Sequence, residues 1–378
     1  YQRCPIWGDI GISSGLCHWA ETVRFFAKGA KMRREIAIIG DNFMLPDVFE
    51  DKLIDVIGPN HYIRKRQDNW PDQDLEHGYA VDGMDGLKEY FGHPDEVVDF
   101  VGDAEIFITH LAPMSRVMFE KMPNLKMLAV SRGGPVSIDM NAAKDHGVTV
   151  VNTPGRNASA VAEFTIGAIL AESRNIRSGH EALRLGVYRG DLYRADNVGR
   201  ELSEMTVGVI GYGKVGVLLV KLLKAFGCRI LVNDPYVQLT SEDAKAGVKM
   251  VSFEEILSQS DVISLHPRVT EETKGMMNAA AFAKMKTNSI FVNTARGPLC
   301  DYDALYEALT TGQIGQAMLE TFAVEPPPAD WQLLKLPNVT LTPHIAGASM
   351  RTVTFAAEQV AEDVRRYIAG EPQNNRCI

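Results

Sequence analysis

Short apolar runs alternate with helix-like segments along most of the chain. The runs that predict strands lie at residues 35–40, 105–110, 125–131, 148–153, 206–211, 230–234, 262–266, 290–294, 317–322 and 339–342. Several of them, such as VGVIG and LAVS, are apolar throughout, as in strands that are covered on both faces. Strands that alternate with helices favour parallel sheets with right-handed crossovers. The pattern therefore predicts an α/β protein.

The series of strands is too long for one small sheet, and a glycine-rich motif lies in its middle. We therefore expect two doubly wound parallel-sheet lobes. A cofactor domain over residues 156–344 would be inserted into a substrate-binding domain made of residues 32–155 and 345–378. A long amphipathic stretch, residues 159–185, is expected to bridge the two halves. A last helix is expected over residues 349–369, ending at Gly370 ahead of Pro372.

The first 31 residues do not share this pattern. They begin with Tyr1, show no clear periodicity and hold two of the five cysteines, whereas a strand-like run follows directly after Met32. We interpret them as a vector-derived or misassigned start, with a genuine extension as the alternative.

Composition narrows the classes of protein to consider. The 378 residues are 46% hydrophobic and 23% charged, which suits two globular cores. A formal charge of -9 without a concentrated basic run argues against nucleic acid or an anionic membrane surface as a partner. No apolar run reaches the roughly 18 residues that span a bilayer. The cysteines are odd in number and lack metal-ligand spacing, which favours a reducing cytoplasm and no metal site: Cys4, Cys17, Cys228, Cys300 and Cys377.

The segment from Met205 to Pro235 holds the strongest local motif. Gly211, Gly213 and Gly216 lie between a predicted strand and a helix. In dinucleotide-binding proteins the first glycine allows a tight turn, the second lets the backbone approach the pyrophosphate, and the third allows close helix packing. The N–H groups that open the helix, around Lys214 and Val215, would then face the phosphates. The spacing predicts a bound dinucleotide.

Asp234 ends the strand after the motif and indicates which dinucleotide binds. Its carboxylate can accept hydrogen bonds from both hydroxyls of the adenosine ribose and would repel a 2'-phosphate, which favours NAD over NADP. Arg229 lies at the start of the same strand, where it is poorly placed to bind that phosphate. The alternative is an acidic residue that only begins a turn before Pro235.

Further motifs lie on both sides of the glycine motif: SRGGPVSIDMNAAKDHGVTVVNTPGRNASAVAE, SLHPRVTEET, NTARGPLCDYDAL, the Glu325-Pro326 pair and LTPHIAG. Together with the glycine motif and Asp234, they resemble the D-isomer-specific 2-hydroxyacid dehydrogenase family, especially its phosphoglycerate dehydrogenase-like members. The resemblance covers about residues 32–370. It implies a flavodoxin-like substrate lobe and a Rossmann NAD-binding lobe with a cleft between them, and a homodimer built through the cofactor domains.

Reduction of a 2-keto acid needs a proton donor and a cation that holds the carboxylate. Arg296 follows a predicted strand, where its guanidinium can bind a carboxylate in bidentate fashion. Considered alone, it could equally form a structural ion pair. His344 closes another strand and can donate or accept a proton near pH 7. Glu325 would orient this imidazole and favour its charged form, unless Glu325-Pro326 is only a surface turn. The resemblance supports a catalytic triad of these three residues.

Other site positions of the family also have counterparts in this sequence, and two of them hold a residue that differs from the usual one. Arg132, Gly133 and Gly134 resemble the loop whose backbone N–H groups hold the substrate carboxylate, the alternative being an ordinary turn. Further resemblance places a set of residues along the cofactor: Pro267, Arg268, Thr273, Thr294, Ala295 and Glu320. Here Arg268 stands at the usual proline position and Glu320 where the family usually has Asp, which shifts the expected contacts.

The triad indicates only a D-2-hydroxy or 2-keto carboxylate, so the substrate depends on the first lobe. Polar groups that could face its pocket are His110, Arg132, Arg156, Tyr193 and Arg194. They suit a sugar-acid-like substrate, with 3-phosphoglycerate the leading candidate, although surface positions would explain them as well. His110 and His266 are otherwise expected to be structural. The competing function is a dinucleotide-sensing, corepressor-like binding protein; formate oxidation is disfavoured because those relatives pair the histidine with Gln.

Overall fold

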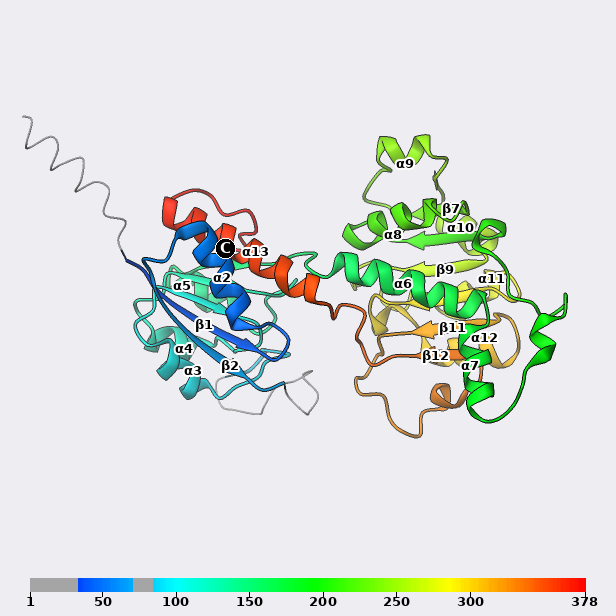
Figure 1. The fold of residues 1–378 in the computed structure, drawn as a ribbon, viewed down its shortest axis with the longest axis horizontal. Helices are drawn as coiled ribbons and strands as arrows, with labels where there is room; N and C mark the ends of the chain where they lie inside the picture. Colours follow the sequence, from blue (N-terminus) through cyan, green and yellow to red (C-terminus); the bar gives the residue numbers. More distant parts are fainter. Residues whose placement is uncertain (1–32, 71–83) are drawn as a thin grey trace, which may run out of the picture.

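Two parallel sheets organise the chain into two lobes. The computed structural model describes residues 33–70 and 84–378, so the interpretation of the first 31 residues lies outside the described part. Figure 1 shows the first lobe in blue and cyan and the second in green to orange. Each sheet has helices on both faces, which confirms the predicted doubly wound α/β class.

The first sheet contains five parallel strands in the order β2-β1-β3-β4-β5. Their bounds are β1 Glu35–Asp41, β2 Tyr62–Asp68, β3 Ile106–Thr109, β4 Met127–Val130 and β5 Thr149–Asn152. The order reverses between β1 and β3, and ligands bind such sheets at the carboxyl ends of the strands near this switch. The helices before the crossover to the second lobe are α2 Pro46–Ile57, α3 Pro94–Val101, α4 Arg116–Lys121 and α5 Met140–Asp145.

The second sheet contains seven parallel strands in the order β12-β11-β10-β9-β6-β7-β8. Their bounds are β6 Thr206–Ile210, β7 Arg229–Asn233, β8 Lys249–Met250, β9 Val262–Leu265, β10 Ile290–Asn293, β11 Gln316–Leu319 and β12 Val339–Leu341. The order reverses between β6 and β9, directly beside the glycine motif. The helices of this part are α8 Lys214–Lys224, α9 Ser241–Lys245, α10 Phe253–Gln259, α11 Ala279–Lys284 and α12 Tyr302–Thr310.

The last helix, α13 Met350–Ala369, returns to the first lobe. Ser349 caps its start by accepting a hydrogen bond from the N–H of Thr352, and Gly370 ends it with a left-handed backbone, as predicted. Its apolar face packs with α2 on one side of the first sheet (Figure 1). The C-terminal segment therefore completes the fold of the first lobe.

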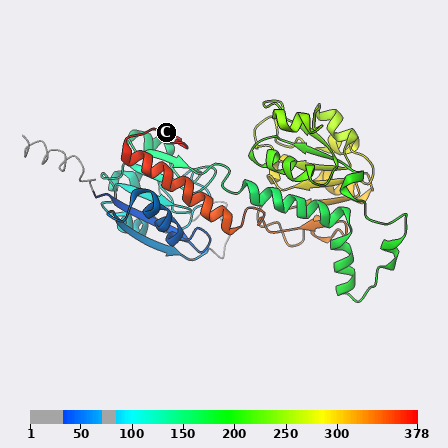
Figure 2. The same ribbon diagram turned by 45° about the horizontal axis from the view of Figure 1, so that its top comes forward.

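The predicted bridging stretch at residues 159–185 is two helices, α6 Ala158–Ser173 and α7 Ile176–Arg184. Asn175 adopts a left-handed conformation with φ 57 and breaks the helix there. α6 is largely apolar and packs between α8 and β10, whereas every residue of α7 is at least partly exposed. In Figure 2, α7 and the segment after it extend beyond the body of the second lobe.

Two strands lacked a signal in the hydrophobic pattern. β2 has the sequence YIRKRQD and forms an edge of the first sheet, where charged side chains stay in water. β8 has only two residues at the opposite edge of the second sheet. Within residues 33–70 and 84–378, none of the helices combines the length and apolar character needed to cross a membrane.

Candidate active site

The glycine motif forms a tight turn from β6 into α8. Gly211 has φ 91, and a Cβ there would lie 2.7 Å from the carbonyl carbon of His266. A Cβ on Gly216 would lie 2.1 Å from the carbonyl oxygen of Gly211, so the helix packs directly on the turn. Gly213 caps α8 and has open space where its Cβ would point. An anion could therefore approach the N–H groups at Lys214 and Val215 that begin the helix.

Asp234 follows β7 beside this turn. One carboxylate oxygen accepts the N–H of Tyr212 at 2.8 Å, and the other accepts the N–H of Tyr236 at 2.9 Å. These bonds fix the carboxylate next to the glycine turn, half-exposed to an incoming ribose. An open Gly213 and a fixed Asp234 at the switch point of the sheet fit a dinucleotide.

Lys214 directs its side chain toward the connection between the lobes. Its ammonium donates to the carbonyl oxygen of Pro154 at 2.7 Å. The backbone of Lys214 thus lies at the candidate phosphate site, while its side chain holds the segment that leads from β5 into α6.

The loop after β9 lies on the other side of the switch point. Pro267 is half-buried beside Gly211, and Arg268 is exposed. The hydroxyl of Thr273 donates to the carbonyl of Arg268 at 2.6 Å, which closes the loop into a compact turn. His266 is bonded to the hydroxyl of Ser264 at 2.8 Å, and burial lowers its pKa to about 3. His266 is therefore neutral near pH 7.

The end of β10 supports the residue that is expected to bind the substrate. Asn293 is fully buried, and its side-chain amide donates to the carbonyl of Arg296 at 3.0 Å and accepts the N–H of Ala295 at 3.1 Å. Thr294 is bonded to Thr165 of α6 at 2.9 Å. The Arg296 side chain is exposed and donates to the carbonyl of Ala295 at 2.7 Å. Sequence analysis missed the role of Asn293, although its position at a strand end was visible.

Glu325 and His344 meet at the same edge of the sheet, on the loops that follow β11 and β12. Nδ1 of His344 lies 2.7 Å from Oε2 of Glu325, and Oε1 of Glu325 accepts the N–H of Phe322 at 2.8 Å. Burial raises the pKa of the Glu325 carboxyl, but the bonds to His344 and Phe322 and the charge of Arg296 leave it below its usual value. Glu325 is therefore ionised at neutral pH, beside an imidazole that is 44% exposed.

Two backbone features bring these loops together. A Cβ on Gly297 would lie 2.0 Å from the carbonyl carbon of Phe322, so the turn that carries Arg296 packs against the loop that carries Glu325. His344 has φ 52, a conformation that non-glycine residues seldom adopt outside constrained sites.

Glu320 holds the segment that carries His344. It is 1% exposed, and its carboxylate accepts the N–H of Ala346 at 2.6 Å, while its carbonyl accepts the N–H of His344 at 3.1 Å. Burial raises the pKa of this carboxyl. One of its carboxylate oxygens is thus engaged within the protein.

Arg132 comes from the first lobe, directly after β4. Its guanidinium donates to the carbonyl of Glu89 at 2.8 Å and also bonds the Glu89 carboxylate. Burial and the nearby charge of Arg296 lower the pKa of Arg132 to about 10. The candidate site therefore includes side chains of both lobes. Gly133 and Gly134 have open space where side chains would point, and the carbonyl of Gly133 accepts the Asn152 amide at 2.9 Å.

His110 of the first lobe lies beside Arg156 of the connection to the second lobe, whereas Tyr193 and Arg194 do not join them. Nε2 of His110 lies 3.3 Å from the Arg156 guanidinium. Tyr193 is 94% exposed in the segment after α7, and Arg194 forms an exposed ion pair with Asp196. The polar residues of the candidate substrate pocket thus belong to two separate places.

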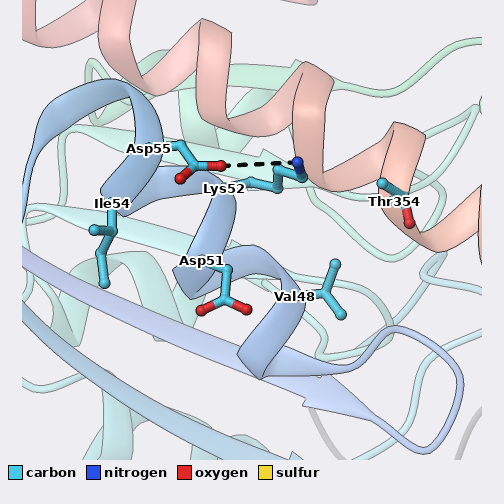
Figure 3. A pocket seen from close by; sticks show the side chains of 6 residues that line it. All are labelled: Val48, Asp51, Lys52, Ile54, Asp55 and Thr354. Carbon is cyan, nitrogen blue, oxygen red and sulfur yellow. Dashed lines mark ion pairs between the residues drawn. The ribbon is translucent and has the colours of Figure 1, made fainter.

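A hollow on the surface of the first lobe lies elsewhere. Figure 3 shows it between α2 and α13, lined by Val48, Asp51, Lys52, Ile54, Asp55 and Thr354. Lys52 and Asp55 form an ion pair across 3.7 Å at its rim. The hollow contains none of the predicted site residues and is distinct from the candidate active site.

Comparison with known proteins identifies the family. Residues 166–346 match the model of the D-isomer specific 2-hydroxyacid dehydrogenase, NAD binding domain. The glycerate dehydrogenase of Methylorubrum extorquens is 37% identical over 290 residues, which cover 74% of this chain and 88% of that protein. The chain belongs to the D-isomer-specific 2-hydroxyacid dehydrogenase family. It is accordingly an NAD-dependent oxidoreductase, as its glycine turn and Asp234 indicate.

Two further similar proteins show how much of this chain, and how much of each of them, is matched. The D-3-phosphoglycerate dehydrogenase of Archaeoglobus fulgidus is 39% identical over 252 residues, covering 67% of this chain but 47% of that protein. The chain thus matches about half the length of this relative. A solved D-2-hydroxyisocaproate dehydrogenase superposes with a TM-score of 0.74 and 26% identity, covering 90% of this chain and 99% of that one. The two-lobed fold is therefore shared over nearly the whole chain.

Proposed function

We propose that this dehydrogenase interconverts a D-2-hydroxy acid and its 2-keto acid with NAD(H), through Arg296, Glu325 and His344. The observation that carries the proposal is the 2.7 Å contact between Glu325 and His344 at the sheet edge that also carries Arg296 and the glycine turn. A paired imidazole and carboxylate next to a free guanidinium is the set of groups that keto-acid reduction needs.

Arg296 binds the substrate carboxylate in this proposal. Its guanidinium is exposed and retains N–H donors beyond the one bonded to Ala295, so it can hold a carboxylate in bidentate fashion and polarise the adjacent carbonyl. The open backbone at Gly133 and Gly134 supplies further N–H donors from the first lobe.

His344 moves the proton. Because Nδ1 is bonded to ionised Glu325, the outer nitrogen Nε2 is the one that gives a proton to the carbonyl oxygen during reduction and removes it during oxidation. Glu325 keeps the ring oriented and favours its charged form. Glu320, through Ala346, fixes the loop that carries the ring.

Bound NADH supplies the hydride for reduction. We assign its phosphates to the backbone at Gly211, Gly213, Lys214, Val215 and Gly216, and its adenosine ribose to Asp234. The loop of Pro267, Arg268 and Thr273 lies beside the glycine turn and would line the adenosine half, with Thr294, Ala295 and Glu320 nearer the nicotinamide half.

A sugar-acid-like substrate, with 3-phosphoglycerate the leading candidate, fits two arginines on the side of the first lobe. Arg132, in the first lobe, and Arg156, in the connection that leaves it, provide charged donors there, and the two relatives described above are named for glycerate and 3-phosphoglycerate. We assign residues 32–155 and 345–378 to this substrate lobe and residues 156–344 to the cofactor lobe.

The quaternary structure and location are also proposed. The arm of α7 and the segment after it exposes a series of apolar side chains, which favours a homodimer through the cofactor lobes: Ile176, Leu183, Leu185, Val187, Tyr188, Tyr193 and Val198. The cysteines of the described residues are free thiols, as expected in a reducing cytoplasm: Cys228, Cys300 and Cys377.

The test is NADH consumption with 3-phosphohydroxypyruvate, hydroxypyruvate, glyoxylate, pyruvate and phenylpyruvate. We expect reduction of at least one of them, with the hydroxylated acids preferred and a D-configured product. Failure to oxidise NADH with every one of them, at protein concentrations that bind NADH, would refute the activity. A preference for pyruvate or phenylpyruvate would refute only the sugar-acid assignment.

A further inference from the structure

Three polar side chains meet at the switch point of the first sheet. Asp41 ends β1, His110 directly follows β3, and Arg156 lies in the connection after β5. The strand order reverses between β1 and β3, so this is the position where an open α/β sheet binds a ligand. The cluster lies at the carboxyl edge of the sheet in the lobe to which the proposed function assigns substrate binding.

The three side chains form a hydrogen-bonded chain. Nδ1 of His110 lies 2.5 Å from Oδ2 of Asp41, and Nε2 of His110 lies 3.3 Å from Nη2 of Arg156. Since Arg156 can only donate, the pairing assigns Nε2 as acceptor and the proton of neutral His110 to Nδ1, facing Asp41. The chain therefore fixes the Arg156 guanidinium through a neutral imidazole.

Asp41 bonds other groups and makes no direct hydrogen bond to Arg156. Its Oδ2 bonds His110, while its Oδ1 accepts the N–H groups of Phe43 at 2.8 Å and Met44 at 2.7 Å. The other printed contact of the Arg156 guanidinium is the sulfur of Met44 at 3.5 Å. Among the described residues, no carboxylate is hydrogen-bonded to Arg156.

Two aromatic rings, Phe43 and Trp70, pack against the cluster. The Arg156 guanidinium lies 5.8 Å from the ring centre of Phe43, and Trp70 stacks on His110 with ring centres 6.4 Å apart. Burial and the nearby charge of Arg132 lower the pKa of Arg156 to about 9, so Arg156 is still charged at neutral pH. A buried cation beside a second one is stabilised by an incoming anion.

The cluster is connected to the reaction centre through charge. Besides burial, the charge of Arg132 helps to lower the pKa of Arg156, and the charge of Arg296 helps to lower the pKa of Arg132, so each guanidinium lies near enough to the next to repel it. Arg132 already holds Glu89, and Arg296 is assigned to the keto-acid carboxylate. Among the described residues, Arg156 is thus the one of these three arginines with neither a carboxylate partner nor an assigned substrate group.

We propose that Arg156, held by His110 and Asp41, determines substrate specificity by binding a second anionic group of the 2-keto acid, a phosphate or a carboxylate remote from the reacting carbon. This inference rests on the proposed dehydrogenase activity and adds the residue that selects the substrate. A planar guanidinium binds such a group by charge-assisted bidentate hydrogen bonds.

The experiment compares kcat/KM of Arg156→Gln, Arg156→Lys and the parent on three substrates. These are 3-phosphohydroxypyruvate, 2-oxoglutarate and glyoxylate, which carry a distal phosphate, a distal carboxylate and no distal group. Arg116→Gln is the matched control, because Arg116 forms an exposed ion pair with Asp145 in the same lobe. Thermal unfolding with and without NADH reports the folding of each variant.

The parent should prefer one of the two substrates that carry a second anionic group to glyoxylate. Which of the two it prefers shows whether the distal group is a phosphate or a carboxylate. Arg156→Gln should lower kcat/KM for that substrate by on the order of 100-fold and lower it for glyoxylate much less. Arg156→Lys keeps the charge, so its kcat/KM for that substrate should lie between those of the parent and the Gln variant. Arg116→Gln should match the parent on all three substrates.

Other results would overturn the inference. An equal loss on all three substrates in a folded Arg156 variant would mean a structural role, and unchanged kinetics would mean no role. A parent that prefers glyoxylate to both doubly anionic acids would also refute it while leaving the dehydrogenase activity intact. A parent that reduces none of the three acids, nor any other 2-keto acid, would instead refute the proposed function itself.

Discussion

At the scale of single residues, the proposed chemistry depends on one hydrogen bond between Glu325 and His344. The carboxylate is half-buried and ionised, and it contacts one ring nitrogen while the other is left for the substrate. The N–H of Phe322 fixes the second carboxylate oxygen. Orientation and charge of the imidazole therefore depend on the same carboxylate.

Replacement of Glu325 by Gln tests the charge separately from the shape. Without the negative charge, the interaction that favours the protonated imidazole is lost. Oxidation needs the neutral ring and reduction needs the charged ring. The acid limb of the pH profile for oxidation and the alkaline limb for reduction should therefore both move to lower pH. Unchanged profiles in both directions would show that Glu325 is not the partner.

Asp234 should set the choice between NADH and NADPH. The parent should prefer NADH, and Asp234→Ala should narrow that preference by about tenfold, because a carboxylate repels the 2'-phosphate. Asp234→Asn is the control, since it removes the charge but keeps an oxygen that can accept the N–H of Tyr212. A smaller preference for NADH over NADPH in both variants would assign the effect to the charge of Asp234. A parent that prefers NADPH would contradict the assignment.

Sequence patterns predict the functional residues at strand ends but not the residues that form hydrogen bonds with them. Glu325 and His344 were visible because each follows a predicted strand of one parallel sheet, and such ends share an edge. Asp41 also ends a strand, yet its bond to His110 spans 69 positions and has no local pattern. Asn293 has a similar position, and its two bonds to the Arg296 turn appear only once the backbone is folded.

At the scale of elements, apolar runs predicted the inner strands well and the edges poorly. β2 is charged because one side of it faces water, and its pairing with β1 comes from backbone bonds rather than an apolar pattern. The break between α6 and α7 depends on one left-handed residue, Asn175, in a sequence that has neither glycine nor proline at that point. Edge strands and single-residue breaks leave little trace in hydrophobicity.

The turn from β6 into α8 offers a matched pair of substitutions. Gly216→Ala places a methyl group 2.1 Å from the carbonyl oxygen of Gly211, so it should lower the free energy of unfolding by about 1–3 kcal/mol and weaken NADH binding. Gly213→Ala meets open space and should leave the melting temperature unchanged while it weakens NADH binding.

Gly167→Ala is the control for this pair. Gly167 lies on the exposed side of α6 with open space around it, so alanine should keep NADH affinity and raise helix stability slightly. Thermal unfolding and NADH titration check the three variants. A Gly216→Ala protein with the stability and affinity of the parent would contradict the close packing of the turn.

At the scale of the whole molecule, the exposed arm after α6 predicts a dimer. Light scattering should give twice the 41.7 kDa of one chain at micromolar concentration. Leu185→Asp, at a side chain that is 83% exposed, should shift the mass to that of one chain without unfolding it. Val117→Asp, at an exposed side chain on α4 of the first lobe, should remain dimeric. A parent with the mass of a single chain would contradict the proposed interface.

The central claim, that His344 is the proton carrier of a 2-keto acid reductase, is tested most directly by His344→Ala. Turnover with NADH and the best 2-keto acid should fall by about 10²–10⁴-fold, while NADH affinity stays that of the parent because the glycine turn is untouched. His180→Ala, at an exposed position on α7, should behave as the parent in both measurements. Turnover of His344→Ala within about threefold of the parent would contradict the account, because general acid catalysis contributes far more than that.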